Sequence, residues 1–315
     1  MILVIGGAST VGVHLVQTLS MKHKVCVLDS CITKQQKSSF PEIVYYEGDL
    51  ENVNTFIHLF ENNSIEAVLH LGATYKGECI EHYRKNIQSV IPVLQVMMRY
   101  DVKKFIFSSS AEVYGHITTE LVTEEHEKNP QSTYGRSLVM IEQILEDYKQ
   151  KYDLNYIVLR NFEIVNSVEK ERSKEEVITQ ILQQCAREIG EVKIASRDKN
   201  RVYIRDYIHA NDVAQAFQLA MNILLQEREH STIYNVATGK GYSVLELIQL
   251  CEEITNEKVT NKVFAYEYEI DSKLIGCTKR IQQDLGWKAT YSLEQIIEEL
   301  WKLKSTNYES SLSVK

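Results

Sequence analysis

The chain has 315 residues, of which 44% are hydrophobic, and its formal net charge at pH 7 is −8. This negative balance disfavours nucleic acid or an anionic membrane surface as the main partner. No apolar run in the sequence approaches the roughly 20 residues that a membrane-spanning helix requires. The length predicts one main domain with a smaller second one, and the apolar content is sufficient for a sizeable core.

Six cysteines are scattered along the chain, and no two of them have the spacing of a metal site or of a redox pair. This pattern favours free thiols in a reducing compartment, so we expect the protein in the cytoplasm. The first residues have the pattern of a buried strand, with no basic segment or cleavage site, and we expect no secretory signal. The cysteines are Cys26, Cys31, Cys79, Cys185, Cys251 and Cys277.

The first stretch is a strand, a glycine turn and a helix. Residues 1–5 are all apolar, which is typical of a strand buried on both faces. Gly6, Gly7 and Gly12 follow, and the last of them lies in an apolar-periodic helix. Glycine lets the backbone turn sharply and lets a pyrophosphate approach the free N–H groups of the helix N-terminus. Ser9 stands where the motif prefers glycine, so we expect its side chain to crowd the phosphate or to hydrogen-bond it.

A second strand, residues 24–28, ends at Asp29. A carboxylate at this place can accept hydrogen bonds from both hydroxyls of an adenosine ribose and would repel a 2′-phosphate. The glycine turn and Asp29 together predict a dinucleotide site that prefers NAD. The alternative is that the glycines serve packing alone, as they do in many strand–helix turns.

Strands and helices alternate along the rest of the chain. This alternation predicts a doubly wound parallel sheet of the Rossmann-like α/β class, with a ligand crevice at the carboxyl ends of the strands. We expect further strands at 42–46, 67–71, 104–107, 156–159, 202–203 and 233–235. We expect helices at 52–60, 81–100, 133–151, 174–188, 212–226, 243–255 and 293–303, and a polar disordered tail at 304–315.

Hydroxyl groups gather where the 104–107 strand ends. Ser108, Ser109 and Ser110 lie at the expected mouth of the crevice, and Tyr134 stands near the start of a helix that faces it. A serine and a tyrosine that converge on one alcohol can move its proton while a nicotinamide takes its hydride. The alternative is that Ser110 caps the local backbone and that Tyr134 is an ordinary half-buried tyrosine.

These features, with several others, occur in the order of a known family. The chain resembles the extended short-chain dehydrogenases, also called NAD-dependent epimerases and dehydratases, and most of all their UDP-glucose 4-epimerase branch. The resemblance runs from Met1 to about Trp301. Its motifs are the glycine turn with Asp29, Gly48-Asp49-Leu50, His70-Leu71-Gly72-Ala73, Ser108-Ser109-Ser110 with Val113-Tyr114-Gly115, Tyr134-Gly135-Arg136-Ser137, Leu159-Arg160-Asn161-Phe162, Arg205-Asp206-Tyr207-Ile208-His209, Tyr234-Asn235 with Gly239, and Leu285-Gly286-Trp287.

The resemblance implies a set of contacts to NAD. The pyrophosphate would lie on the glycine turn, the ribose on Asp29, the adenine beside Asp49 and Leu50, and the nicotinamide beside Ala73. The implied cofactor residues are Gly6, Gly7, Ser9, Thr10, Val11, Gly12, Asp29, Asp49, Leu50, Leu71, Gly72, Ala73, Asn86, Ser108 and Tyr134.

The same resemblance assigns the chemistry. Tyr134 would be the acid and base, Ser110 its helper on the sugar hydroxyl, and Glu112 a further base. Arg205 would bind the diphosphate of a nucleotide sugar through charge-assisted hydrogen bonds. The alternatives are that Glu112 faces solvent from a loop and that Arg205 pairs with Asp206. The implied substrate residues are Ser110, Tyr134, Asn161, Arg205 and Tyr207, and no metal site is implied.

Three departures from the family pattern bear on activity. The family has a lysine four residues after its tyrosine, and here that residue is Leu138. A cation there would hold the tyrosine pKa below its usual value of about 10, so its loss would weaken the base. The family's Gly-Pro after its Arg-x-Phe strand is absent from 163–167. A second diphosphate-binding arginine is missing near 266–270, where glutamates should repel a diphosphate.

We therefore expect an enzyme that oxidises a ring hydroxyl of a nucleotide-activated sugar, most simply a UDP-sugar, with transient use of NAD. Epimerisation, dehydration and reduction stay open. The alternative is a catalytically impaired family member that binds NAD or a nucleotide sugar as a regulator or structural partner. We also expect a homodimer through the helices at 81–100 and 133–151. By the resemblance, the NAD-binding domain would comprise 1–162 and about 201–236, and the substrate lobe about 163–200 and 237–303.

Overall fold

The computed structural model describes residues 1–72, 79–117, 119–165, 177–190, 192–195, 203–226, 230–264 and 272–312. Its largest element is a seven-stranded sheet in the order β11-β6-β5-β4-β1-β2-β3, in which every neighbouring pair is parallel. This confirms the predicted doubly wound fold. The strands are β1 (Ile2–Ile5), β2 (Val25–Asp29), β3 (Val44–Glu47), β4 (Ala67–His70), β5 (Lys104–Ser110), β6 (Asn155–Asn161) and β11 (Thr232–Val236).

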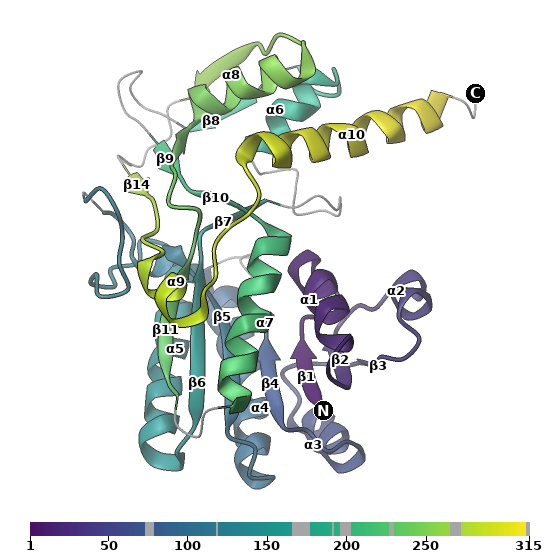
Figure 1. Cartoon of the computed structure of the whole chain (residues 1–315), viewed down its shortest axis with the longest axis vertical. Coiled ribbons are helices and arrows are strands. Elements are labelled where there is room, and N and C mark those ends of the chain that lie inside the picture. The colour runs from purple at the N-terminus through teal and green to yellow at the C-terminus, as the bar shows by residue number, and fades with distance from the viewer. Residues whose placement is uncertain are drawn as a thin grey trace.

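Helices cover both faces of this sheet, and β1 shows why its sequence is apolar throughout. Leu3 and Ile5 face the core cluster shared with helices α3, α4 and α5, whereas Ile2 and Val4 face the cluster shared with α1 and α7. In Figure 1 helices α1 and α7 lie side by side over one face. The helices are α1 (Thr10–Ser20), α3 (Val53–Asn62), α4 (Cys79–Arg99), α5 (Thr133–Tyr152) and α7 (Ala210–Gln226), with the short α2 (Lys34–Ser39) beside β3 and the single-turn η1 (Ala111–Val113) after β5.

A second group of elements lies beyond the carboxyl ends of the large sheet, in the upper part of Figure 1. Helices α6, α8 and α10 enclose a third core cluster that includes Ile181, Leu247 and Ile297. Three small sheets pair β10 with β7, β9 with β12 and β14, and β13 with β8. These elements are β7 (Glu163–Val165), α6 (Val177–Cys185), β8 (Val192–Ala195), β9 (Tyr203–Arg205), β10 (Tyr207–His209), β12 (Tyr242–Ser243), α8 (Val244–Thr255), β13 (Asn261–Phe264), β14 (Ser272–Leu274) and α10 (Leu293–Leu312).

Helix α9 (Lys279–Leu285) returns to the large sheet, so the segment 237–303 contributes to both parts of the molecule. Ile281 and Trp287 are buried in the cluster that α7 shares with the sheet. The Trp287 indole N–H donates a hydrogen bond of 3.0 Å to the Asp212 carbonyl. The Asp212 carboxylate accepts hydrogen bonds from Thr290, which fixes the path from α9 to α10.

The end of the chain differs from the sequence-based expectation of disorder from residue 304. Helix α10 continues to Leu312, and residues 313–315 lie outside the described ranges. Lys304 is 9% exposed and forms an ion pair of 2.8 Å with Glu188. The sequence pattern gave no sign of this partner, because Glu188 is 116 residues away in the chain.

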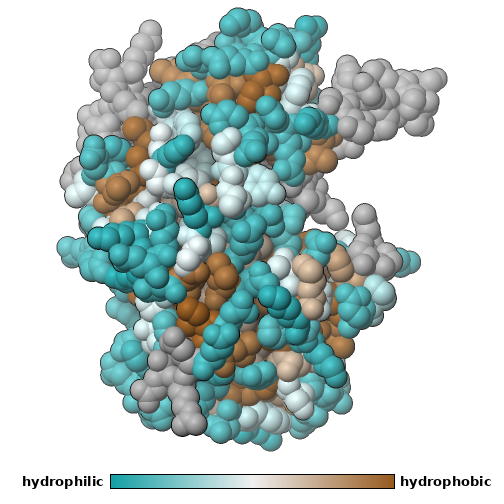
Figure 2. Space-filling view, in the orientation of Figure 1, coloured by the Kyte–Doolittle hydropathy of each residue, from teal (hydrophilic) through white to brown (hydrophobic). Residues whose placement is uncertain are grey.

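The surface shown in Figure 2 is mainly hydrophilic, with smaller hydrophobic patches between the polar residues. Among the described helices, none combines the length and the apolar content that a bilayer-spanning segment needs.

Candidate active site

The glycine turn lies where β1 ends and α1 begins, at the carboxyl edge of the sheet. Gly6 has φ of +80°, and a Cβ added to it would lie 3.1 Å from the backbone nitrogen of Gly72. A Cβ added to Gly12 would lie 2.6 Å from the carbonyl oxygen of Gly6. Both positions therefore need glycine, because only its missing side chain lets the turn, α1 and the end of β4 approach this closely.

Ser9 caps helix α1. Its Oγ accepts a hydrogen bond of 3.1 Å from the Gly12 N–H and donates one of 2.8 Å to the Gly6 carbonyl. By helix geometry the first-turn N–H groups of Thr10 and Val11 have no acceptor within the helix, and the helix dipole favours an anion beside them. The serine therefore stabilises the turn, and the turn fits a pyrophosphate.

Asp29 is the last residue of β2 and lies against the same turn. Its Oδ2 accepts a hydrogen bond of 2.9 Å from the Ala8 N–H, and its Oδ1 accepts one of 3.1 Å from the Cys31 N–H. Each carboxylate oxygen keeps a further lone pair, so the group can also accept bonds from two neighbouring hydroxyls. These residues fit the adenosine ribose of a dinucleotide.

The remaining expected cofactor contacts come from the loops after β3 and β4. Asp49 is exposed and its carboxylate accepts a hydrogen bond from the Glu51 N–H. Leu50 is half-buried and its Cδ1 would lie 3.4 Å from a Cβ added to Gly72. The Leu71 N–H donates to the Ile5 carbonyl. Ala73, expected beside the nicotinamide, lies outside the described residues.

Tyr134 is the second residue of α5, and its ring packs edge to face with His82, with ring centroids 6.2 Å apart. Ser132 caps this helix by accepting a hydrogen bond of 2.9 Å from the Gly135 N–H. The Ser132 hydroxyl in turn donates a short hydrogen bond to the carboxylate of Glu112. Glu112 is exposed, in agreement with the alternative that it faces solvent. Through its hydrogen bond with Ser132, its carboxylate also contacts the start of the helix that carries Tyr134.

Ser110 reaches the same place from β5. It is half-buried, and its Oγ accepts a hydrogen bond of 3.2 Å from the Glu112 N–H, which caps η1. A Cβ added to Gly135 would lie 2.7 Å from the Glu112 carbonyl oxygen, so the glycine lets α5 approach η1. The structure thereby brings the segments of Ser110 and Tyr134 together at the carboxyl edge of the sheet.

Three other expected site residues support the backbone around this edge. Asn161 is buried and donates a hydrogen bond of 2.9 Å to Ser108 Oγ, while its own Oδ1 has no hydrogen-bond partner in the part of the chain that the structure describes. Asn86 is 1% exposed and donates to Ser137 Oγ, which donates to the Tyr134 carbonyl. These contacts position the helix of the tyrosine.

Leu138 lies one helical turn after Tyr134 and is fully buried in the core cluster beneath α5. The side chain therefore packs between the helix and the sheet.

A buried charged cluster, which the sequence analysis missed, lies beneath the serines. Glu142 of α5 accepts hydrogen bonds from Ser109, from Arg160 and from Lys128, with 2.7 Å between Arg160 Nη2 and Glu142 Oε2. Arg160 also donates to the Tyr114 hydroxyl. Burial raises the pKa of Tyr114 to about 12. We call Glu142, Arg160, Tyr114, Ser109 and Lys128 the Glu142 cluster.

Across the edge, Arg205 ends β9 and Asp206 links it to β10. The expected alternative was an Arg205–Asp206 ion pair, but the Asp206 carboxylate accepts hydrogen bonds from Thr238, Gly239 and Gly276. Burial raises the pKa of Asp206 to about 6, although these donors oppose the shift. Arg205 Nη1 donates to the neighbouring Ile204 carbonyl.

Tyr207 and Glu163, which lie near Asp206, differ in burial. Tyr207, expected to contact substrate, is 5% exposed and its side chain belongs to the third core cluster. Glu163 in β7 is exposed, and its N–H donates a hydrogen bond of 3.0 Å to the Asp206 carbonyl. Surrounding protein raises the pKa of the Glu163 carboxyl, the Arg205 guanidinium opposes this shift, and the Glu112 carboxylate adds to it. The sequence analysis noted the departure at 163–167 and assigned no role to Glu163.

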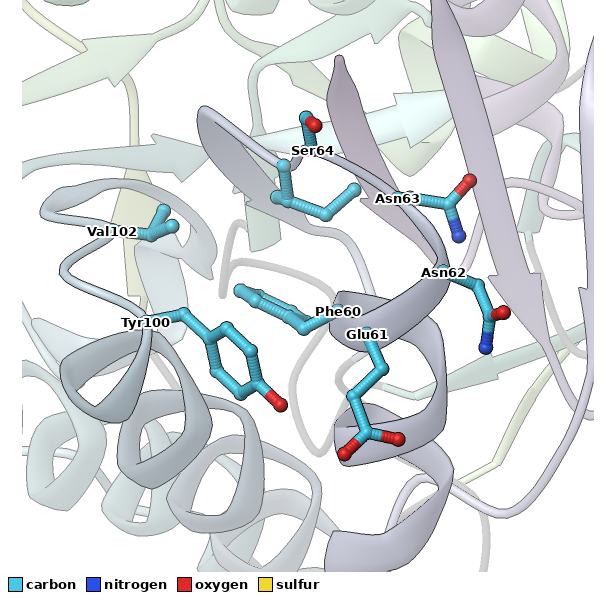
Figure 3. Close-up of a pocket in the computed structure, with 8 residues that line it drawn as sticks. Phe60, Glu61, Asn62, Asn63, Ser64, Tyr100 and Val102 are labelled. Atoms are coloured by element: carbon cyan, nitrogen blue, oxygen red, sulfur yellow. The ribbon is translucent and has the colours of Figure 1, made fainter.

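A hollow of about 320 Å³ lies at the opposite, N-terminal edge of the sheet, next to the starts of β4 and β5. Figure 3 shows the Phe60 and Tyr100 side chains pointing toward each other, and their ring centroids are 5.6 Å apart. The hollow is remote from the residues described above. Its lining is Phe60, Glu61, Asn62, Asn63, Ser64, Ile65, Tyr100 and Val102. No group of three or more potential metal ligands occurs within the described ranges.

A sequence profile of the NAD dependent epimerase/dehydratase family matches residues 2–237. The chain belongs to this family. The family is NAD-dependent. This agrees with the glycine turn, the first-turn N–H groups of α1 and the Asp29 carboxylate described above. The chain is 30% identical to the UDP-glucose 4-epimerase of Halalkalibacterium halodurans, over 95% of this chain and 94% of that protein. It is also 30% identical to the UDP-glucose 4-epimerase of Streptococcus mutans, over 97% of each chain.

Solved structures of epimerases in the family share the whole fold. The UDP-glucose 4-epimerase of Stenotrophomonas maltophila, solved with NAD and formylated UDP-arabinopyranose, is 27% identical with a TM-score of 0.89. The comparison covers 98% of this chain and 99% of that one. The enzyme of Bifidobacterium longum, solved with NAD⁺ and UDP, is 25% identical with a TM-score of 0.87, and 98% of each chain is covered.

Proposed function

We propose that this protein is an NAD-dependent epimerase of a UDP-linked sugar. The observation that carries the proposal is the joint position of Ser110 and Tyr134 at the carboxyl edge of the sheet, beside a turn and an Asp29 carboxylate that fit NAD. Family membership and the likeness to UDP-glucose 4-epimerases over nearly the whole chain support this reading.

Each candidate residue has a distinct role in binding or in proton transfer. The first turn of α1 holds the pyrophosphate and Asp29 holds the adenosine ribose. NAD, when bound, would supply the acceptor and later the donor of the hydride exchanged with the sugar carbon. Tyr134 takes and gives back the hydroxyl proton, and Ser110 hydrogen-bonds the same oxygen. Arg205 supplies the positive charge for the diphosphate.

Leu138 bears on the strength of this base. We propose that it replaces the lysine of related enzymes, so Tyr134 has no ammonium group one helical turn away to lower its pKa. The positive charge of the oxidised nicotinamide would then be the main nearby source of such a shift. We expect a slower enzyme whose rate rises with pH above neutrality.

Replacement of Tyr134 by Phe tests the proposal. The variant should lose at least about a hundredfold in kcat on the UDP-sugar that the wild type converts, because removal of a general acid–base group costs about 10²–10⁴-fold. It should still bind NAD in calorimetry, since the turn and Asp29 are unchanged. Equal inertness of both proteins over a panel of UDP-sugars would favour the alternative of a non-catalytic family member.

We propose that the two domains bind different ligands. Residues 1–162 with 201–236 would bind the cofactor, and residues 163–200 with 237–303 would bind the substrate.

We propose a homodimer through α4 and α5, where Ile80 and Met140 are 69% and 42% exposed. A monomer mass in light scattering would contradict it. All six cysteines are free thiols, which supports a cytoplasmic location.

A further inference from the structure

Two hydrogen bonds join helices α4 and α5 around the turn that carries Tyr134. His82 Nδ1 and Thr133 Oγ1 share a hydrogen bond of 2.8 Å. Asn86 donates a second one, of 2.9 Å, to Ser137 Oγ. Each bond joins residues that are 51 positions apart in the chain, so the two bonds are spaced by one helical turn on both helices. They fix the first turn of α5 against α4.

His82 also contacts the tyrosine itself. Its imidazole and the Tyr134 phenol ring pack edge to face, with ring centroids 6.2 Å apart and ring planes at 72°. Both side chains are half-buried. A threonine hydroxyl can either donate or accept a hydrogen bond, so the bond to Thr133 can form with a neutral or with a protonated imidazole. His82 can therefore stay beside the tyrosine in both charge states.

The position of His82 matters because Leu138, one helical turn after Tyr134, is buried and apolar and brings no charge to the phenol. Histidine is the side chain whose charge changes between about pH 5 and 8. An opposite charge within about 4–6 Å favours the ionised form of a group, which for a phenol is the phenolate that takes up a proton. The other charged groups near this pair already have partners: Glu81 with Arg84 and Lys85 on α4, and Glu112 with Ser132 before α5.

We propose that His82 is a positioning residue for proton transfer at Tyr134, which holds the phenol ring in place and, when protonated, stabilises the tyrosinate. This inference rests on the proposed function and deepens it. The imidazolium adds a second positive charge to that of the oxidised nicotinamide, and this second charge belongs to the chain itself.

The proton balance of the pair predicts a characteristic pH dependence. A neutral His82–Tyr134 pair and an imidazolium–phenolate pair hold the same number of protons, so the ratio of the two forms does not change with pH. The phenolate takes the sugar hydroxyl proton and later returns it, so the imidazolium proton is not consumed. His82 thus gives the enzyme a population of base near neutral pH that does not require loss of a proton to solvent.

The first test titrates Tyr134 by the ultraviolet absorbance of phenolate in the full-length, NAD-loaded protein. Subtraction of the Tyr134→Phe signal, made in each background, isolates this tyrosine. His82→Asn keeps an amide that can bond Thr133 but removes the charge, and it should raise the titration midpoint of Tyr134 by about 1 pH unit. The matched control is His58→Asn, since His58 of α3 packs edge to face with Tyr46 of β3 at a centroid distance of 6.4 Å. It should leave the midpoint unchanged.

The second test measures kcat and KM for UDP-glucose from about pH 6 to 9. At pH 7, His82→Asn should lose about tenfold in kcat with KM within about twofold, because the strength of the base acts on the chemical step. Its kcat should rise about tenfold per pH unit, more steeply than that of the wild type. Leu138→Lys in the His82→Asn background should recover most of the loss, since it again places a cation one turn from Tyr134. A purely structural role of His82 would change neither the slope nor the response to the lysine.

The outcomes separate this inference from the proposed function. If Tyr134→Phe abolishes turnover but His82→Asn leaves the titration midpoint and the slope of kcat with pH as in the wild type, the role of His82 is wrong and the epimerase assignment stands. If calorimetry shows that the NAD-loaded wild type binds no UDP-sugar, the assignment fails and the inference fails with it. Thermal unfolding checks that each variant is folded. If the Leu138→Lys variant does not fold, the titration of His82→Asn still decides.

Discussion

Two regions beside the carboxyl edge of the sheet, which would form the two walls of the expected crevice, are each held by a buried carboxylate, but the partners of the two carboxylates differ in charge. On the sheet side, Glu142 is 4% exposed and accepts hydrogen bonds from Arg160, Lys128 and Ser109. On the opposite side, Asp206 is 1% exposed, and the donors to its carboxylate among the described residues are backbone N–H groups and one hydroxyl.

The difference predicts that the two walls respond differently to mutation and to pH. A carboxylate paired with a guanidinium leaves an uncompensated buried charge when the partner is removed. A carboxylate held by neutral donors has no opposite charge to offset the loss of water, so burial raises its pKa, as it does for Asp206. Removal of a cation on the sheet side should therefore lower the stability of the protein, whereas the contribution of the other side to stability should depend on pH.

The largest effect is expected from Arg160→Met. The change leaves the Glu142 carboxylate buried beside only a partly exposed lysine, since the Lys128 side chain is 31% exposed. We expect a loss of about 3–5 kcal/mol in the free energy of unfolding, measured by urea denaturation. Activity should fall as well, because Glu142 holds α5 against the serines.

Two controls sharpen this prediction. Lys128→Met removes the partly exposed partner and should cost no more than about 1 kcal/mol. A double variant with Met at both Glu142 and Arg160 should recover part of the loss, because it leaves no buried charge. A loss from Arg160→Met as small as that from Lys128→Met would show that the pair does not hold this wall.

The next effect concerns pH. Because the pKa of Asp206 is raised to about 6, the folded state holds this proton more tightly than the unfolded chain, whose carboxyl titrates near its usual value of about 4. The contribution to stability is full below pH 4 and is lost as pH rises through 6, by about 3 kcal/mol. Asp206→Asn cannot titrate, so the difference in unfolding free energy between wild type and variant should change by that amount over this range. A difference independent of pH would contradict the assignment.

The smallest effect compares two helix caps, one on each side of the crevice. Ser132 caps the tyrosine helix and binds Glu112, whereas Ser243 caps α8 in a capping box with Glu246. Replacement of either serine by alanine should cost about 1 kcal/mol of stability. Only Ser132→Ala should also lower kcat/KM, by roughly threefold to tenfold, because it frees the first turn around Tyr134. Equal kinetics in the two variants would show that the cap does not position the tyrosine.

Much of the fold was predictable because its signals are local. The all-apolar β1, the glycine turn and Asp29 are contiguous patterns, and the structure places them as expected. Elements with weak patterns, such as α9 and the three-residue β7, were missed because tertiary packing and long-range pairing decide them. The packing of Tyr207 in a core is another such case, since the sequence does not show which face of a short strand is covered.

The sequence by itself determined the fold class, the glycine turn and the family, because each depends on residue types at short, fixed spacings. Only the tertiary structure decided which polar side chains stabilise the surrounding backbone and core. Ser9 caps α1, the Asp206 carboxylate accepts a hydrogen bond from the Gly239 N–H, and Glu142 forms an ion pair with Arg160. These roles depend on donors and charges from distant segments, and side-chain burial and hydrogen bonding are set only when those segments pack together.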